Sequence, residues 1–295
     1  MSRNLFRKIF DFYLYSNLQV ALCAVAMVGV TQIIFGYHLR AELFIFVFCG
    51  TFFLYNLQRL PSAFAKGKIE SEFIRHKWNI DHKIFLAIIS AIAALAAGWS
   101  FFQLYHRSQI IALLPAILSL AYAFPFIPWK GKWKQLRDFK VVKIFIVALV
   151  WGIICALLPA AAADTTGENW FTPAVLIWFL AYCGLFFSLV IPFDIRDLHF
   201  DGDKLKTIPA LLGVKHSILL SLAVLSLSNV LVFSCTISYG MGDIKAFAAF
   251  FLWSCVAGIF ISKSTPQRKE YYFSFFIDGL MILLFVFLYL ESFIK

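Results

Sequence analysis

The feature that most constrains this chain is a series of nine long apolar stretches. A transmembrane helix needs roughly 20 mostly apolar residues, because the hydrocarbon core of a bilayer is about 30 Å thick. Runs of this length are too long for β-strands, and the alternating polar and apolar positions of a membrane β-barrel are absent. The sequence therefore predicts an all-α membrane helix bundle with nine transmembrane helices. The stretches run near 13–36, 41–60, 84–104, 108–127, 141–162, 171–193, 209–235, 245–262 and 271–290.

The composition excludes the soluble classes of protein. Hydrophobic residues make up 62% of the 295 residues and charged residues 14%, against roughly 25% charged in ordinary globular domains. A water-soluble chain of this length could not cover so much apolar surface. This excludes a soluble enzyme, a nucleic-acid-binding domain and a disordered linker. Because no soluble domain fits into the loops, we predict a single transmembrane domain over residues 1–295.

The basic residues predict how the bundle is oriented. A formal net charge of +10 can indicate nucleic-acid binding, but in so apolar a chain it indicates basic loops on one side of a membrane. With nine crossings, 22 of the 26 Lys and Arg residues lie on the side of the N-terminus. Cytoplasmic loops are enriched in Lys and Arg. We therefore expect a cytoplasmic N-terminus, a C-terminus outside, and a location such as a bacterial inner membrane.

The strongest cluster of chemistry-bearing residues is at the cytoplasmic end of the sixth stretch. Asp194, Asp197 and Asp201 have the spacing i, i+3, i+7 and so lie on one face of a helix. Three carboxylates on one face repel each other unless cations hold them together, and Mg²⁺ takes carboxylate oxygens while leaving positions for phosphate oxygens. The alternative is a solvated acidic helix end that Arg196 and the lysines of the following loop balance.

This region resembles the UbiA-type intramembrane prenyltransferases. Asp194, Asp197 and Asp201, within DIRDLHFD and followed by LKTIPALLG, match the family's second aspartate-rich motif. The stretch 119–125, with the residues that follow up to Gly152, is similar to the connection between the family's fourth and fifth helices. The resemblance implies that the three aspartates are catalytic and hold Mg²⁺. It also implies a polyprenyl diphosphate donor and a hydrophobic acceptor, such as an aromatic compound, within the bilayer.

The family's first motif, NxxxDxxxD, is altered in this chain. Asn56 matches its first position, but Leu60 and Phe64 stand where the family has aspartates. Arg and Lys can neutralise a diphosphate as well as a metal can. We therefore expect Asn56, Arg59 and Lys66 to orient the diphosphate. The alternatives are a helix–helix hydrogen bond for Asn56 and the positive-inside bias for the two basic residues.

Four more residues complete the predicted substrate-binding set. Asp278 lies about two turns into the ninth stretch, where a carboxylate needs a partner or a wet cavity, so it either lines a cavity or pairs with a base such as Lys143. It could also be an ordinary interfacial residue at a helix start. Tyr122 is a candidate contact for the acceptor or for a carbocation, or a residue of the bundle core. Lys143 and Arg196 are the basic members of the set.

The leading hypothesis for function is an intramembrane prenyltransferase. The main alternative is a non-catalytic UbiA-like homologue that binds a prenyl lipid or a membrane partner, which the altered first motif favours. A small-solute transporter is a third possibility, supported by the number of spans alone, since no internal repeat is clear. No feature of the sequence indicates a nucleic-acid partner.

Overall fold

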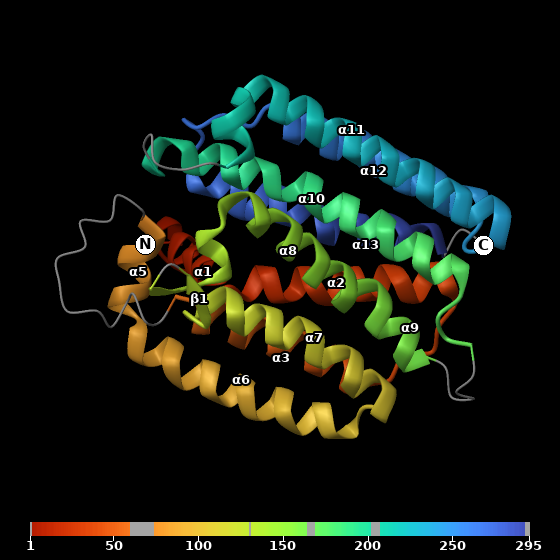
Figure 1. Cartoon of the computed structure of the whole chain (residues 1–295), viewed down its shortest axis with the longest axis horizontal. Coiled ribbons are helices and arrows are strands. Elements are labelled where there is room, and N and C mark those ends of the chain that lie inside the picture. Colours follow the sequence, from red (N-terminus) through yellow and green to blue (C-terminus); the bar gives the residue numbers. More distant parts are fainter. Residues whose placement is uncertain (1, 60–73, 130, 164–168, 202–206, 293–295) are drawn as a thin grey trace.

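The computed structural model of the chain describes residues 2–59, 74–129, 131–163, 169–201 and 207–292, and it is a bundle of helices. Figure 1 shows long helices that run side by side along the long axis, with α2 near the middle. The helices are α1 Ser2–Tyr15, α2 Leu18–Phe35, α3 Ala41–Leu57, α5 Ile74–Asp81, α6 Lys83–Gln103, α7 His106–Ala123, α8 Lys140–Gly152, α9 Leu158–Ala163, α10 Pro173–Asp201, α11 Ile208–Tyr239, α12 Ile244–Ser262 and α13 Asp278–Ser292.

The predicted all-α membrane bundle is confirmed, although the number of nine spans is not. Within the described ranges, seven helical segments are long and apolar enough to cross a membrane. The other two predicted stretches also fold as helices. Of these, α3 has 17 residues, and α7 begins with the polar run 106–109 and contains Pro115. The protein is thus an integral, multi-pass membrane protein.

The first predicted stretch, 13–36, is wrong at its start, because two helices occupy it. The chain breaks at Asn17, which has a left-handed backbone with φ 68°, a conformation that Asn tolerates better than most residues. The preceding helix α1 exposes Leu5 and Ile9 together with Arg7 and Lys8. A helix with both apolar and basic exposed side chains suits the interface between bilayer and water.

The core of the bundle forms around α2, most of which is buried. Trp178 and Tyr182 of α10 pack together with their ring centroids 4.9 Å apart, and both are buried. Trp178 donates to the Thr31 hydroxyl at 2.9 Å, and Tyr182 donates to the Met27 carbonyl at 3.0 Å. Since lipid offers no competing water, such bonds give helix packing its specificity.

The outer helices expose large apolar side chains. On α6, Ile88, Leu95 and Phe102 are 56%, 75% and 77% exposed. Leu219 and Val230 of α11 are similarly exposed. A soluble protein would not present such faces to water, so these surfaces face lipid.

Several irregular elements interrupt the long helices. A short hairpin, β1 Ile127–Trp129 and β2 Lys132–Lys134, precedes α8 and was not predicted. Helix α11 starts with Thr207 as its cap and Pro209 in its first turn, close to the predicted start, and it is kinked at Gly213, where φ is 76°. The described residues include two π-helical turns, Ile153–Leu157 between α8 and α9 and Tyr272–Ile277 directly before α13.

Close contact between α8 and α10 depends on Gly152. A β-carbon at this position would lie 2.6 Å from Cys183 Sγ and 3.1 Å from Phe179 Cε2. We expect Gly152→Ala to lower stability in detergent by about 1–3 kcal/mol, the usual cost of overpacking. The matched control is Gly98→Ala on α6, where nothing lies within 4 Å of the added carbon. Thermal unfolding measures both, and equal midpoints would contradict the tight packing at Gly152.

Candidate functional site

A cavity of about 180 Å³ lies among the helix ends on the side of the bundle where α1 and α5 are found (Figure 1). Helices α2, α5, α8, α10 and α13 contribute to its wall, together with the end of α3 and the residue Arg59 that follows it. Part of the wall is apolar, with Phe186, Leu189, Phe193 and Met281 among its members. The charged part consists of Arg59, Arg75, Lys143, Arg196, Asp197 and Asp278.

Arg196, near the end of α10, is held by contacts on several sides. Its Nε donates to Asp197 Oδ1 at 2.8 Å, and its Nη1 donates to the two carboxylate oxygens of Glu270 at 3.3 and 3.1 Å. The guanidinium carbon lies 5.3 and 5.7 Å from the ring centroids of Phe193 and Phe273, within the range of cation–π attraction. These contacts fix the guanidinium at the cavity wall.

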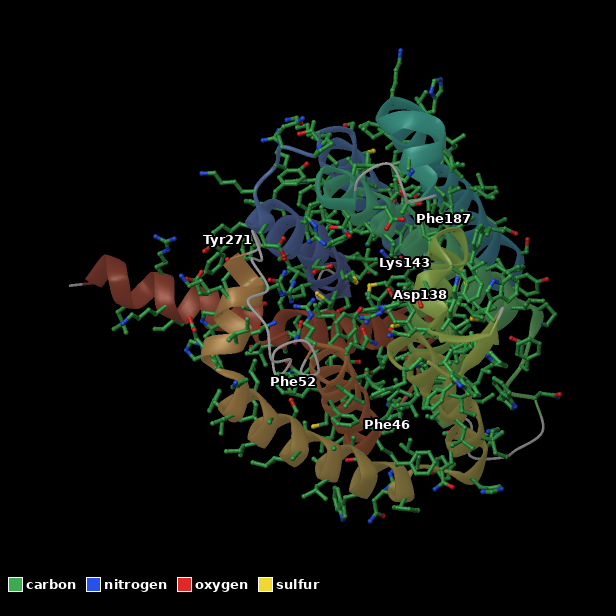
Figure 2. All side chains as sticks on the ribbon, turned by 60° about the vertical axis from the view of Figure 1, so that its left-hand side comes forward. Phe46, Phe52, Asp138, Lys143, Phe187 and Tyr271 are labelled. Carbon is green, nitrogen blue, oxygen red and sulfur yellow. The ribbon has the colours of Figure 1, made fainter. Side chains whose placement is uncertain are left out.

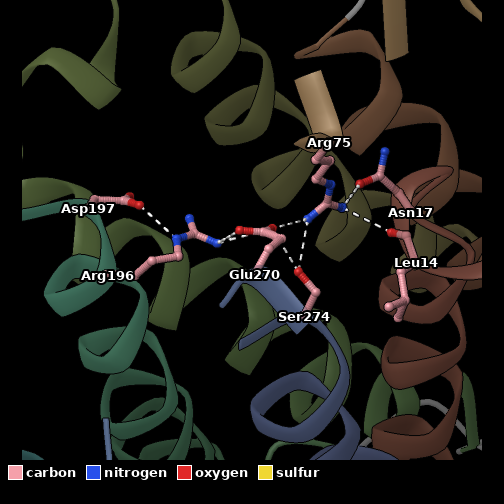
Figure 3. Close-up of polar contacts among 7 residues, drawn as sticks. All are labelled: Leu14, Asn17, Arg75, Arg196, Asp197, Glu270 and Ser274. Atoms are coloured by element: carbon pink, nitrogen blue, oxygen red, sulfur yellow. Dashed lines mark hydrogen bonds and ion pairs between the residues drawn. The ribbon is translucent and has the colours of Figure 1, made fainter. Parts of the chain in front are cut away.

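Glu270 is also bound by a second guanidinium, that of Arg75 on α5 (Figure 3). Arg75 Nη1 lies 3.5 Å from Glu270 Oε1 and 3.4 Å from Ser274 Oγ, and the Ser274 hydroxyl donates to the same carboxylate at 2.9 Å. Arg75 Nη2 donates to Asn17 Oδ1 at 2.6 Å and to the Leu14 carbonyl at 3.2 Å. Glu270 thus links Arg75 to Arg196, and we call these three residues the Glu270 bridge. With Asn17 and Leu14 it joins α5, α10, the start of the last span and the break between α1 and α2.

The electrostatics of this cluster favour an incoming anion. Burial lowers the pKa of the Arg59 guanidinium well below its ordinary value, and the charge of Arg75 lowers it further. Burial also lowers the pKa of Arg75, although Glu270 opposes this. For Glu270 itself, burial raises the carboxyl pKa, but Arg196 and Arg75 bring it below its ordinary value. Guanidinium groups stay protonated in proteins, so these side chains keep their charges although burial costs free energy. A bound anion would reduce that free-energy cost.

Lys143 binds the most deeply buried carboxylate among the ion pairs of the described residues. Its Nζ donates to Asp194 Oδ1 at 2.9 Å, and the Asp194 side chain is 1% exposed against 21% for Lys143. Figure 2 shows Lys143 in the middle of the bundle rather than on its rim. Lys143 lines the cavity, whereas Asp194 is not part of the wall. Asp194 thus holds the lysine that lines the cavity but does not line the cavity itself.

Asn56, near the end of α3, is hydrogen-bonded to the break between α1 and α2 and to its own helix. Its side-chain nitrogen donates to the carbonyls of Ser16 and Phe52, both at 3.0 Å, and its side-chain oxygen accepts from Asn17 at 2.8 Å. Asn17 in turn accepts from Arg75 at 2.6 Å. These contacts match the helix–helix alternative for Asn56, and they connect it to the Glu270 bridge.

A second cavity, of about 210 Å³, adjoins the first. Tyr122 and Ser119 of α7 line it. Trp151 Nε1 donates to the Tyr55 hydroxyl at 3.3 Å. The residues that line both cavities are Tyr55, Arg59, Val147 and Trp151.

The predicted site residues occupy different places around this end of the bundle. Asn56 and Asp194 are buried behind the first cavity, and Tyr122 lines the second. Lys66 and the side chain of Asp201 lie outside the part of the chain that the structure describes. The predicted residues that share the first cavity are Arg59, Lys143, Arg196, Asp197 and Asp278.

Two residues of this site were not predicted from the sequence. Arg75 was one of several basic residues in its loop region, and Glu270 follows a loop that contains Lys263, Arg268 and Lys269. Neither has a motif or a diagnostic spacing. A lone acidic residue within a basic loop, eight positions before Asp278, is the weak signal that could have indicated Glu270.

The described carboxylates do not fit an Mg²⁺ site in their present arrangement. Mg²⁺ requires nearly octahedral oxygen ligands at about 2.0–2.1 Å. Asp194 is bound to Lys143 at 2.9 Å, and Asp197 to Arg196 at 2.8 Å. Among the described residues, no group of three or more His, Cys, Asp or Glu side chains converges as metal ligands. Basic side chains therefore stand where a metal would have to bind.

The fold is similar to that of UbiA homologues. One from Archaeoglobus fulgidus bound to GPP and Mg²⁺ has a TM-score of 0.66 and 11% identity, over 95% of this chain and 98% of that one. An apo homologue from Aeropyrum pernix K1 has a TM-score of 0.64 and 14% identity, over 94% and 98%. Digeranylgeranylglyceryl phosphate synthase has a TM-score of 0.61 and 15% identity, over 98% of this chain and 100% of that one.

No family model and no curated protein matches the sequence. At 11–15% identity the likeness establishes the UbiA-type fold. The resemblance stated from the sequence is confirmed at that level.

The Lys143–Asp194 pair provides a test of this geometry. Lys143→Met leaves a buried carboxylate without its cation, which typically costs about 3–5 kcal/mol. Lys143→Met combined with Asp194→Asn removes both charges and should recover most of that loss. Thermal unfolding in detergent measures the stability of both variants, with Lys245→Met at an exposed position as the control. A Lys143→Met variant as stable as the wild type would contradict a buried pair.

Proposed function

We propose that this protein transfers a prenyl group from a polyprenyl diphosphate to a hydrophobic acceptor inside the membrane. The observation that carries the proposal is the first cavity, where four basic side chains meet an apolar and aromatic wall within a bilayer-spanning bundle. A prenyl diphosphate has the same division, since a multiply charged head is joined to an apolar chain. Structural neighbours bound to GPP and Mg²⁺ or to DMAPP and Mg²⁺ support a substrate of this class.

The proposed reaction follows from the two parts of the wall. The basic side chains receive the diphosphate and stabilise the charge that builds on it as the allylic carbon–oxygen bond breaks, with the electron pair leaving on the diphosphate oxygen. The resulting allylic carbocation lies beside aromatic rings such as Trp151, Phe186 and Phe193, whose faces stabilise positive charge. The acceptor then supplies the electron pair of the new bond and releases a proton, for which Asp278 on the same wall is the proposed base.

The second cavity is the proposed place for the acceptor. It carries Ser119 and Tyr122 as hydrogen-bonding groups, and its wall shares Arg59 with the first cavity. A hydroxyl-bearing or ring-containing head group would find both polar and apolar contacts there. Among the described residues, Tyr55, Arg59, Val147 and Trp151 line both cavities, and Trp151 donates a hydrogen bond to Tyr55. The two substrates would approach each other at this point.

Turnover by the purified protein tests the proposal. Labelled polyprenyl diphosphates of several lengths are incubated with a membrane lipid extract, in Mg²⁺ or in EDTA, and both products and released diphosphate are measured. We expect a prenylated product, and a loss of roughly 100-fold or more for Arg196→Ala, as is usual when one donor to developing charge is removed. Arg40→Ala, an exposed residue outside the cavity, is the matched control. Binding of the diphosphate without any release would favour the non-catalytic homologue instead.

We also propose that the cavity opens toward the cytoplasm, since 22 of the 26 basic residues fall on its side of the predicted bundle. A reporter enzyme that is active only outside the cytoplasm should then be active when fused after Lys295. The same reporter fused after Lys263, between α12 and the last span, should be inactive. Activity of the second fusion and silence of the first would reverse the proposed orientation.

A further inference from the structure

The basic side chains of the first cavity come from separate parts of the chain and meet at one wall. Arg59 follows α3, Arg75 lies on α5, Lys143 on α8 and Arg196 on α10. Building on the proposed function, we infer that these four side chains themselves bind the diphosphate group, and that this binding does not require a divalent metal ion. The ligand class is a diphosphate anion, free or at the head of a prenyl chain.

The first support comes from the carboxylates that would otherwise bind metal. Asp194 accepts from Lys143 at 2.9 Å and Asp197 from Arg196 at 2.8 Å. A metal ion would have to displace these cations from carboxylates that are 1% and 25% exposed. Leaving a buried cation without its partner is costly. The ion pairs therefore favour a site that keeps its basic side chains and works through them.

The second support is the rigidity of the two bridged guanidiniums. Glu270 lies 3.5 Å from Arg75 and 3.1 Å from Arg196, and both arginine side chains are mostly buried. Arg75 is also held by the Asn17 side chain and by the Leu14 carbonyl. Guanidinium groups attract phosphate oxygens strongly because they keep their positive charge and donate charge-assisted hydrogen bonds. Because their positions are already fixed, little conformational entropy remains to be lost when the anion binds.

The third support is the charge balance of this end of the chain. Among the described residues, the cavity wall has four cations and two carboxylates, Asp197 and Asp278. Glu270 and Asp194, which pair with three of these cations, do not line the cavity. The predicted cytoplasmic side contains 22 of the 26 basic residues and 11 of the 16 acidic residues, so its net charge is positive. Leu60 and Phe64, which replace the aspartates of the family's first motif, remove two metal ligands and two charges that would repel a diphosphate. Each of these differences favours direct binding of the anion by the protein.

Binding of inorganic diphosphate to the purified wild-type protein tests the inference without any variant. Calorimetric titrations are run in detergent, in EDTA and in Mg²⁺, with sulfate at matched ionic strength as the control anion. We expect saturable binding in EDTA, with a dissociation constant within about threefold of the value in Mg²⁺, and at least tenfold weaker binding of sulfate. Binding that appears only when Mg²⁺ is added would overturn the inference.

Variants then test which side chains bind the anion. Arg59→Gln and Arg196→Gln should each weaken diphosphate binding in EDTA by at least tenfold, whereas Arg40→Ala on the opposite side should leave it unchanged. Thermal unfolding without ligand shows whether each variant is folded. If a variant is not folded, the wild-type titrations in EDTA and in Mg²⁺ still test whether diphosphate binding needs a metal ion. Unchanged affinity in both folded arginine variants would place the anion elsewhere and refute the proposed site.

The outcome can be separated from that of the proposed function. Prenyl transfer in Mg²⁺, together with diphosphate binding that depends strictly on Mg²⁺, would refute metal-independent binding and leave the transferase proposal in place. Diphosphate binding without metal, together with no prenyl transfer to any acceptor, would support metal-independent binding and refute the transferase proposal. If neither inorganic nor prenyl diphosphate binds under either condition, both proposals fail.

Discussion

The Glu270 bridge is the interaction on which the rest of the site depends. One carboxylate binds the guanidiniums of Arg75 and Arg196, and Ser274 supports it from the same helix turn. Because burial disfavours the charge of each group separately, none of the three would be stable there alone. Together they join the start of the last span to α5 and α10, and through Asn17 they reach the break between α1 and α2 (Figure 3).

The bilayer explains why this network lies at one end of the bundle. The outer faces of α6 and α11 are apolar because they meet lipid, so charged side chains are confined to the helix ends and the interior. The apolar side chains that continue the cavity wall into the bundle then lie next to the basic ones. A cavity with one charged and one apolar part is a direct consequence of this separation, and it matches the two parts of a prenyl diphosphate.

The ion pairs give two carboxylates of the aspartate-rich run partners within the protein. At a spacing of i, i+3, i+7 the three carboxylates lie on one helix face, which predicts a shared cation. In the structure Asp194 turns to Lys143 of α8, and Asp197 to its neighbour Arg196. The cations that balance the two described carboxylates are thus side chains of the protein. This arrangement is the reason for treating the basic wall as the anion-binding element.

The sequence by itself determined the membrane bundle, because runs of about 20 apolar residues match the bilayer thickness and, without β alternation, span lipid only as helices. It also indicated the UbiA-type fold through the aspartate-rich run, and it identified five charged residues that share one cavity. Only the tertiary structure decided which charges pair. Arg75 and Glu270 are 195 positions apart, and Lys143 and Asp194 are 51 apart. Such pairings depend on how helices pack, and neither spacing nor hydropathy records them.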